Sequence, residues 1–166
     1  MIGARWALVI AVALTLQSSL VAGIELFGSR GDLVVLVVIA AALAGGPDQG
    51  AFVGFGAGLA LDLLVQTPFG LSALALSITG YAIGSFQGTV LRSAWWIPVL
   101  NAGAGSMLGI VLFAVGGEMV GQDDLIRGDL AGIIAVVALI NMLLILPAVR
   151  AARWAMTDTR PRLSSR

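Results

Sequence analysis

The stretch GFGAGLALDLLVQTPFGLSALALSITGY, residues 54–81, holds the features that decide how this chain folds. Two continuously apolar runs flank a short connection at residues 66–70, and one carboxylate, Asp62, lies near the end of the first run. Continuous apolar runs are typical of helices surrounded by protein or lipid, whereas membrane-barrel strands alternate apolar and polar residues. The stretch therefore predicts two helices joined by a tight turn.

The rest of the 166-residue chain repeats this pattern of apolar segments separated by short polar gaps. Apolar residues make up 59% of the chain and charged residues only 11%, whereas a soluble domain carries about 25% charged residues. A bilayer core of roughly 30 Å is crossed by about 20 helical residues. We therefore predict an all-α integral membrane protein, a bundle of six transmembrane helices with spans near residues 4–22, 33–46, 49–66, 71–91, 95–115 and 130–149.

These spans leave room for one membrane domain, residues 1–154, and a basic tail, residues 155–166. The second span has a short apolar core that the sequence Gly45-Gly46-Pro47-Asp48 ends, so a full crossing and a partly re-entrant segment both remain open. Residues 1–22 could also be read as a signal peptide, but the spans that follow favour a retained first helix.

The arginines predict the orientation of the bundle. Five of the nine lie at or beyond Arg150, and six spans would place them on the same side as Arg5 and Arg92. Cytoplasmic ends of membrane proteins are enriched in Lys and Arg. Both termini are therefore expected in the cytoplasm, where the tail would attract anionic lipid headgroups.

Asp62 is the residue whose position asks most for an explanation. A carboxylate in hydrocarbon costs several kcal/mol unless it is paired or hydrated, and such residues usually have a function. One interpretation is structural: the carboxylate ends its helix and accepts hydrogen bonds from nearby backbone or from a hydroxyl such as that of Thr67. The other interpretation is contact with a ligand or partner, and the sequence leaves both open.

Glycines recur at four-residue intervals, which places them along one side of a helix. Small residues in such rows let two helix backbones approach closely. Packing within the bundle is the favoured interpretation, and an intermolecular surface is the alternative. The predicted packing residues are Gly54, Gly58, Gly80, Gly84, Gly105 and Gly109.

The residue inventory argues against catalysis. The chain has no His, Cys or Lys, so a nucleophile with an adjacent base would have to be built from Asp62 and hydroxyl groups. We expect no catalytic residues, no bound metal and no cofactor, and we expect no nucleic-acid partner because the basic residues are few.

The residues around the turn resemble those of the MreD family of bacterial rod shape-determining proteins. The resemblance is carried by Leu61-Asp62-Leu63-Leu64, then Thr67-Pro68-Phe69-Gly70-Leu71, then Gly80-Tyr81. Chain length, the six-span pattern and the basic tail agree with the family, while the sharp motifs are confined to residues 54–84. Family members often carry a His or a similar residue after the turn, where this chain has Ser72.

The resemblance implies a noncatalytic scaffold subunit of the cell-elongation complex in the bacterial inner membrane. Its partners would be MreC, bound directly through a membrane helix, and then MreB, RodA and a class B penicillin-binding protein. The fold would be similar to the substrate-binding subunits of energy-coupling-factor transporters, and a vitamin-binding subunit of that type is the alternative function. The residues expected to contact a partner or line a pocket are Asp62, Thr67, Pro68, Phe69, Gly70 and Tyr81.

Overall fold

A computed structural model describes residues 2–21, 33–64, 69–86, 96–119, 121 and 130–157 of the chain. Six helices make up this part, which confirms the predicted all-α chain with six helices. They are α1 (Ile2–Val21), α2 (Leu33–Gly45), α3 (Pro47–Leu64), α4 (Leu71–Phe86), α5 (Ile97–Met119) and α6 (Leu130–Met156).

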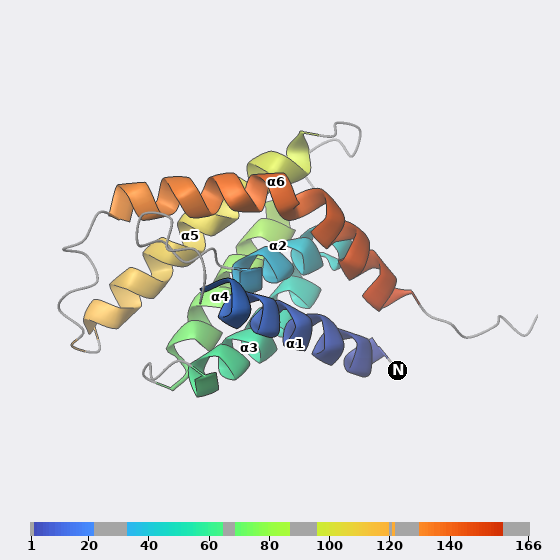
Figure 1. Cartoon of the computed structure of the whole chain (residues 1–166), viewed down its shortest axis with the longest axis horizontal. Coiled ribbons are helices and arrows are strands. Elements are labelled where there is room, and N and C mark those ends of the chain that lie inside the picture. Colours follow the sequence, from blue (N-terminus) through green and yellow to red (C-terminus); the bar gives the residue numbers. More distant parts are fainter. Residues whose placement is uncertain are drawn as a thin grey trace, which may run out of the picture.

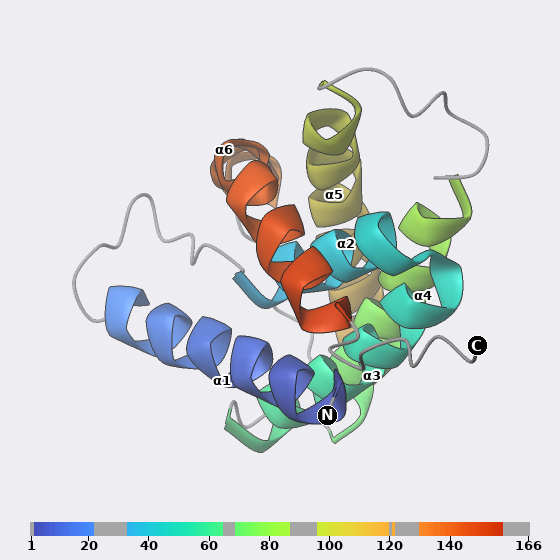
Figure 2. The same ribbon diagram turned by 90° about the vertical axis from the view of Figure 1, so that its right-hand side faces the viewer.

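Helix α2 forms the centre of the bundle and contacts all five other helices (Figure 2). Its sequence, LVVLVVIAAALAG, is apolar on every side, and residues 34–43 are buried except Val37. A helix without a polar face is stable only when it is surrounded by protein or lipid. The segment with the shortest predicted span is therefore the core helix of the molecule.

The turn between α2 and α3 follows from two adjacent residues. Gly46 has a positive φ of 88° and its N–H donates to the Ala42 carbonyl at 2.8 Å, which ends α2. Pro47 then occupies the first position of α3, where its missing N–H is not needed. The two helices therefore follow one another with almost no loop.

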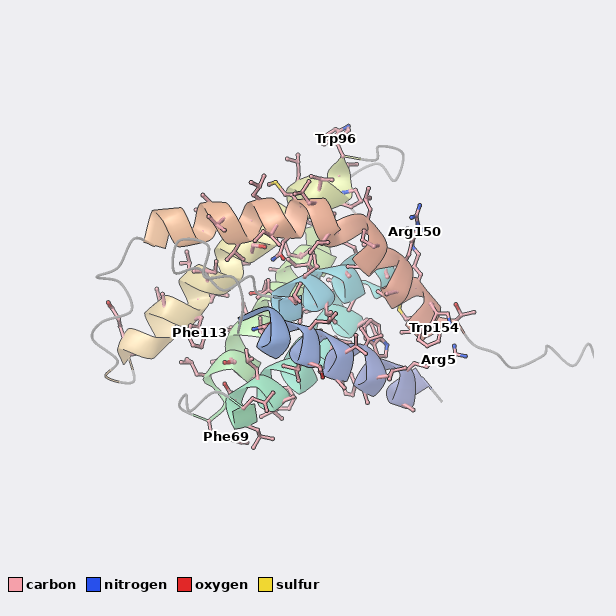
Figure 3. The ribbon with its side chains drawn as sticks, viewed as in Figure 1. Arg5, Phe69, Trp96, Phe113, Arg150 and Trp154 are labelled. Atoms are coloured by element: carbon pink, nitrogen blue, oxygen red, sulfur yellow. The ribbon has the colours of Figure 1, made fainter. Side chains whose placement is uncertain are left out.

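The first and last helices meet at one end of the molecule. Arg5 Nη1 on α1 donates to the backbone carbonyls of Trp154 (3.3 Å) and Thr157 (2.6 Å) at the end of α6. Figure 3 shows Arg5 and Trp154 beside each other, far from Phe69. Helix α6 contains Pro147 and changes direction along its length (Figure 1), as a proline inside a helix predicts.

Two segments, Ile97–Met119 and Ile134–Met156, are long and apolar enough to cross a membrane. Gly3–Gln17, Leu33–Gly45 and Leu71–Phe86 are shorter apolar helices. Helix α5 continues beyond its predicted span to Met119, and α6 continues through Arg150 and Arg153 to Met156. The predicted spans end at polar residues because they estimate the membrane-embedded part of each helix. A helix can continue beyond the hydrocarbon core of the membrane, as α5 and α6 do beyond their predicted spans.

Candidate functional site

The carboxylate of Asp62 lies at the start of α4 and accepts hydrogen bonds from three backbone N–H groups. Asp62 Oδ2 accepts from Gly70 N at 2.8 Å and from Ala73 N at 3.4 Å, while Oδ1 accepts from Ser72 N at 3.2 Å. Asp62 is only 5% exposed. The first turn of a helix leaves its N–H groups without partners inside the helix, and Asp62 supplies partners from the preceding helix.

The residue at the N-terminal end of α4, Gly70, explains why a side chain from another helix caps α4. Its carbonyl accepts from Leu74 N at 2.9 Å, so Gly70 occupies the capping position of α4. Asn, Asp or Ser at that position would cap the helix with its own side chain. Gly70 has no side chain and has a φ of 98°, a conformation that glycine adopts without strain. Asp62 therefore performs the capping that the local residue cannot.

These bonds give the Asp62 carboxylate a structural role at the start of α4, and its contact with a ligand or partner stays a prediction. Thr67 and Pro68 lie outside the described residues. Ser72 is buried, and its Oγ has no hydrogen-bond partner among the described residues.

Phe69 and Tyr81, the two aromatic residues of the predicted site, point outward instead. Phe69 is 71% exposed and Tyr81 is 54% exposed. Leu74 and Ile78 are also exposed, and their spacing places them with Tyr81 on one side of α4. We call Leu74, Ile78 and Tyr81 the outer face of α4. The sequence analysis did not select Leu74 and Ile78. The available signal was that both lie on the side of the helix opposite the glycine row of α4.

The glycines of α3 and α4 face one another inside the bundle. A methyl group added at Gly54 would collide with the Leu76 carbonyl, and one at Gly58 would collide with the backbone of Ala73. At Gly84 it would lie 2.5 Å from Pro47 Cα, and Gly80 lies against the backbone of Gly50. The backbones of α3 and α4 are therefore in direct contact at these glycines.

The two glycines of α5 differ in how tightly they pack. A methyl group at Gly105 would lie 2.7 Å from Ile39 Cδ1, whereas at Gly109 its nearest neighbour would be Thr79 Oγ1 at 3.6 Å. The second distance is an ordinary van der Waals contact. A methyl group at Gly105 would therefore have to displace the end of the Ile39 side chain, whereas one at Gly109 would displace nothing.

A buried polar pair joins α5 to α6. Asn141 Nδ2 donates to Ser106 Oγ at 2.7 Å, and Ser106 Oγ donates to the Ala102 carbonyl at 2.7 Å. Both side chains are fully buried. Hydrogen bonds of this kind link helices inside membranes, and nothing in the sequence identifies Ser106 as the partner.

Two grooves open on the surface near α1. The first, of about 430 Å³, lies between α1, α2 and α6 and is lined by apolar side chains and Trp154. The second, of about 490 Å³, lies between α1 and α3, with Gln49 and Trp6 among its lining residues. Within the described part of the chain, no group of three or more His, Cys, Asp or Glu residues could hold a metal ion.

The described part of the chain is helical, and its two long apolar helices together with a central helix that has no polar face indicate a membrane protein of the helical-bundle class. Residues 3–116 match the family described as rod shape-determining protein MreD, and the chain belongs to this family. The match covers α1 to most of α5 and includes Asp62 and the turn after it. No curated protein and no solved structure matches the chain.

Family membership gives the general role of the protein. It is a shape-determining membrane protein, a structural component and not a member of a known enzyme family, and it belongs to the rod-shape complex with other Mre proteins.

Proposed function

We propose that this chain is a noncatalytic scaffold that binds MreC through a transmembrane helix and helps to position peptidoglycan synthesis during cell elongation. MreB, RodA and a class B penicillin-binding protein would act in the same assembly. The family supports the general role, and the outer face of α4 supports the direct contact with a partner helix.

The phenol of Tyr81 is the observation that carries this proposal. Tyr81 lies ten residues after Leu71, so it is roughly 15 Å along α4 and well inside the helix. Its hydroxyl group has no hydrogen-bond partner among the described residues, although the side chain is half exposed. A hydroxyl facing hydrocarbon without a partner is unfavourable, and a neighbouring membrane helix would provide an acceptor.

The residues of the predicted site divide into two roles in this proposal. Asp62 and Gly70 hold the start of α4 in place, whereas Phe69 and Tyr81 contact the partner. Thr67 and Pro68 would shape the connection between α3 and α4.

Co-purification from native membranes tests the contact. Tyr81→Ala should lower the amount of MreC recovered, and Tyr81→Phe should do the same to a lesser degree because it removes only the hydroxyl. Met107→Ala is the matched control, since Met107 is 55% exposed on α5. Equal recovery of MreC with the Tyr81 and Met107 variants, at equal protein levels, would exclude the outer face of α4 as the contact.

The placement in the membrane forms part of the same proposal. Six crossings of the bacterial inner membrane would leave both termini cytoplasmic, with a membrane domain over residues 1–154 and a basic tail over residues 155–166. The contact between Arg5 and the end of α6 supports this arrangement, because it holds both ends of the helical bundle on one side.

A fold like that of energy-coupling-factor substrate-binding subunits is also proposed, but without their ligand. Sites for polar small molecules need several convergent polar groups. The lining of the groove between α1, α2 and α6 is apolar apart from the Trp154 indole, and that of the other groove adds Gln49 and Trp6. Thermal stabilisation by any member of a vitamin panel would instead favour the transporter function.

A further inference from the structure

We propose that α1 separates from the rest of the bundle inside the membrane, and that Arg5 is the latch that holds it in place. Helix α1 would then exist in two positions, docked and open. The structure shows the docked position, in which α1 lies against α2 and α6. Opening of α1 would not require the proposed contact of α4 with MreC.

Helix α1 touches the bundle along a narrow seam, because a groove runs along each of its sides. One groove lies between α1, α2 and α6, and the other lies between α1 and α3. Among the α1 side chains that the structure describes, only Trp6 and Ala13 are buried. In a bilayer, apolar side chains gain little from facing protein instead of lipid tails. The apolar seam alone therefore holds α1 weakly.

Polar contacts at the two ends of α1 supply the rest of its attachment. At one end, the Arg5 guanidinium donates to the carbonyls of Trp154 and Thr157 and lies 5.1 Å from the centre of the Trp154 ring. At the other end, Gln17 Oε1 accepts from Val34 N at 3.3 Å, and the chain itself joins α1 to α2. Hydrogen bonds from a charged donor are stronger than neutral ones, and the cation–π contact adds to them. Arg5 is therefore the latch, and the Gln17 end is the pivot.

The docked position leaves the indole N–H of Trp6 without an acceptor. Trp6 is 5% exposed, and its Nε1 has no hydrogen-bond partner among the described residues. A buried donor without an acceptor is unfavourable. Trp6 lies beside Arg5 near the start of α1, at a level where a tryptophan that faces lipid can donate to headgroups or water. Opening would supply this missing hydrogen bond, so the latch holds α1 docked against that cost.

The opening of α1 would uncover the central helix of the bundle. Helix α2 has no polar side chain in its sequence, and Leu36 and Val37 line the groove beside α1. Exposing these side chains to lipid leaves no polar side chain of α2 in hydrocarbon. The latch thus controls access to α2 from the bilayer.

Electron paramagnetic resonance in nanodiscs tests whether α1 has two positions. The chain has no cysteine, so spin labels attach only where cysteines are introduced. Labels at Ala4→Cys on α1 and Met107→Cys on α5, both exposed sites, should give one main distance and a minor longer one. Arg5→Ala should raise the ratio of the longer to the main distance about tenfold. The same distance distribution in both proteins would overturn the latch.

A second pair of labels distinguishes movement of α1 from loosening of the whole bundle. Asp48→Cys on α3 and Met107→Cys on α5 are placed on helices other than α1. The distance between these two labels should stay the same when Arg5→Ala is introduced. A change in this distance would show a general loss of structure and would also overturn the proposal.

Trp6→Phe should have the opposite effect to Arg5→Ala. This substitution keeps an aromatic ring and removes the N–H that lacks an acceptor, so in the Arg5→Ala background the ratio of the longer to the main distance should fall about fivefold. Trp96→Phe is the matched control, because Trp96 is 49% exposed, and it should leave the ratio unchanged. An equal or higher ratio with Trp6→Phe would show that the indole N–H does not oppose docking and would overturn that part of the proposal.

Discussion

The carboxylate of Asp62 belongs to the sequence of α3 but completes the structure of α4. It satisfies the N–H groups of Gly70, Ser72 and Ala73. In lipid, a backbone donor without a partner costs several kcal/mol. One residue therefore fixes where α4 begins and how it meets α3.

Asp62→Asn should destabilise the protein by about 1–3 kcal/mol, because an amide offers one acceptor oxygen where the carboxylate offers two. Thermal unfolding in detergent micelles measures the effect. Asp48→Asn is the control, since Asp48 is an exposed carboxylate in the first turn of α3. Equal unfolding temperatures for the two variants would contradict the capping role.

Asp62 also illustrates which features of single residues could be predicted from the sequence alone. A structural carboxylate at the end of α3 could be predicted, because the turn that it would contact follows within a few residues. The outward direction of Phe69 could not, since a turn residue has no helical periodicity to orient it. Nor could the cation–π contact of Arg5 with Trp154, which joins residues at opposite ends of the chain.

At the scale of the elements, the antiparallel pair α3 and α4 is joined by backbone contact. Gly54→Ala should lower stability by about 1–3 kcal/mol, because its methyl group would collide with the Leu76 carbonyl and lie 2.9 Å from Ser77 N. Gly56 on the same helix has no atom within 4 Å of an added methyl group. Gly56→Ala should therefore leave stability unchanged or raise it slightly. Thermal unfolding of both variants would reveal the difference, and similar losses would disprove close α3–α4 contact.

The link between α5 and α6 provides a second test at this scale. Ser106→Ala leaves Asn141 Nδ2 without its buried acceptor and should cost roughly 0.6–1.7 kcal/mol. Ser85→Ala is the control, because Ser85 Oγ is exposed and bonds only to the Tyr81 carbonyl on its own helix. A Ser106 variant that unfolds at the same temperature as the Ser85 variant would show that the pair contributes little.

Helix pairing was predictable from sequence only where small residues recur. The glycine rows of α3 and α4 indicate a close contact because their four-residue spacing repeats on both helices. The position of α2 at the centre was not predicted, because a uniformly apolar helix gives the same pattern in lipid and in protein. The packing of the other helices around α2, which its hydropathy does not reveal, places α2 at the centre of the bundle.

For the whole molecule, the contact of Arg5 with the end of α6 predicts that both termini lie on the same side of the membrane. Reporter fusions at residues 1 and 166 should both give the cytoplasmic signal. A fusion after Phe69, which Figure 3 shows at the opposite end of the molecule, should give the periplasmic signal. Termini on opposite sides would be incompatible with six crossings.

The capping of α4 by Asp62 of α3 has a consequence for how the protein enters the bilayer. If α4 left the translocation machinery without α3, three N–H groups of its first turn would lack the carboxylate that accepts their hydrogen bonds. When α3 is already beside α4, Asp62 supplies these hydrogen bonds as α4 folds. The two helices are therefore expected to enter the membrane together as one hairpin. The close backbone contact at their glycines would keep the pair together during insertion.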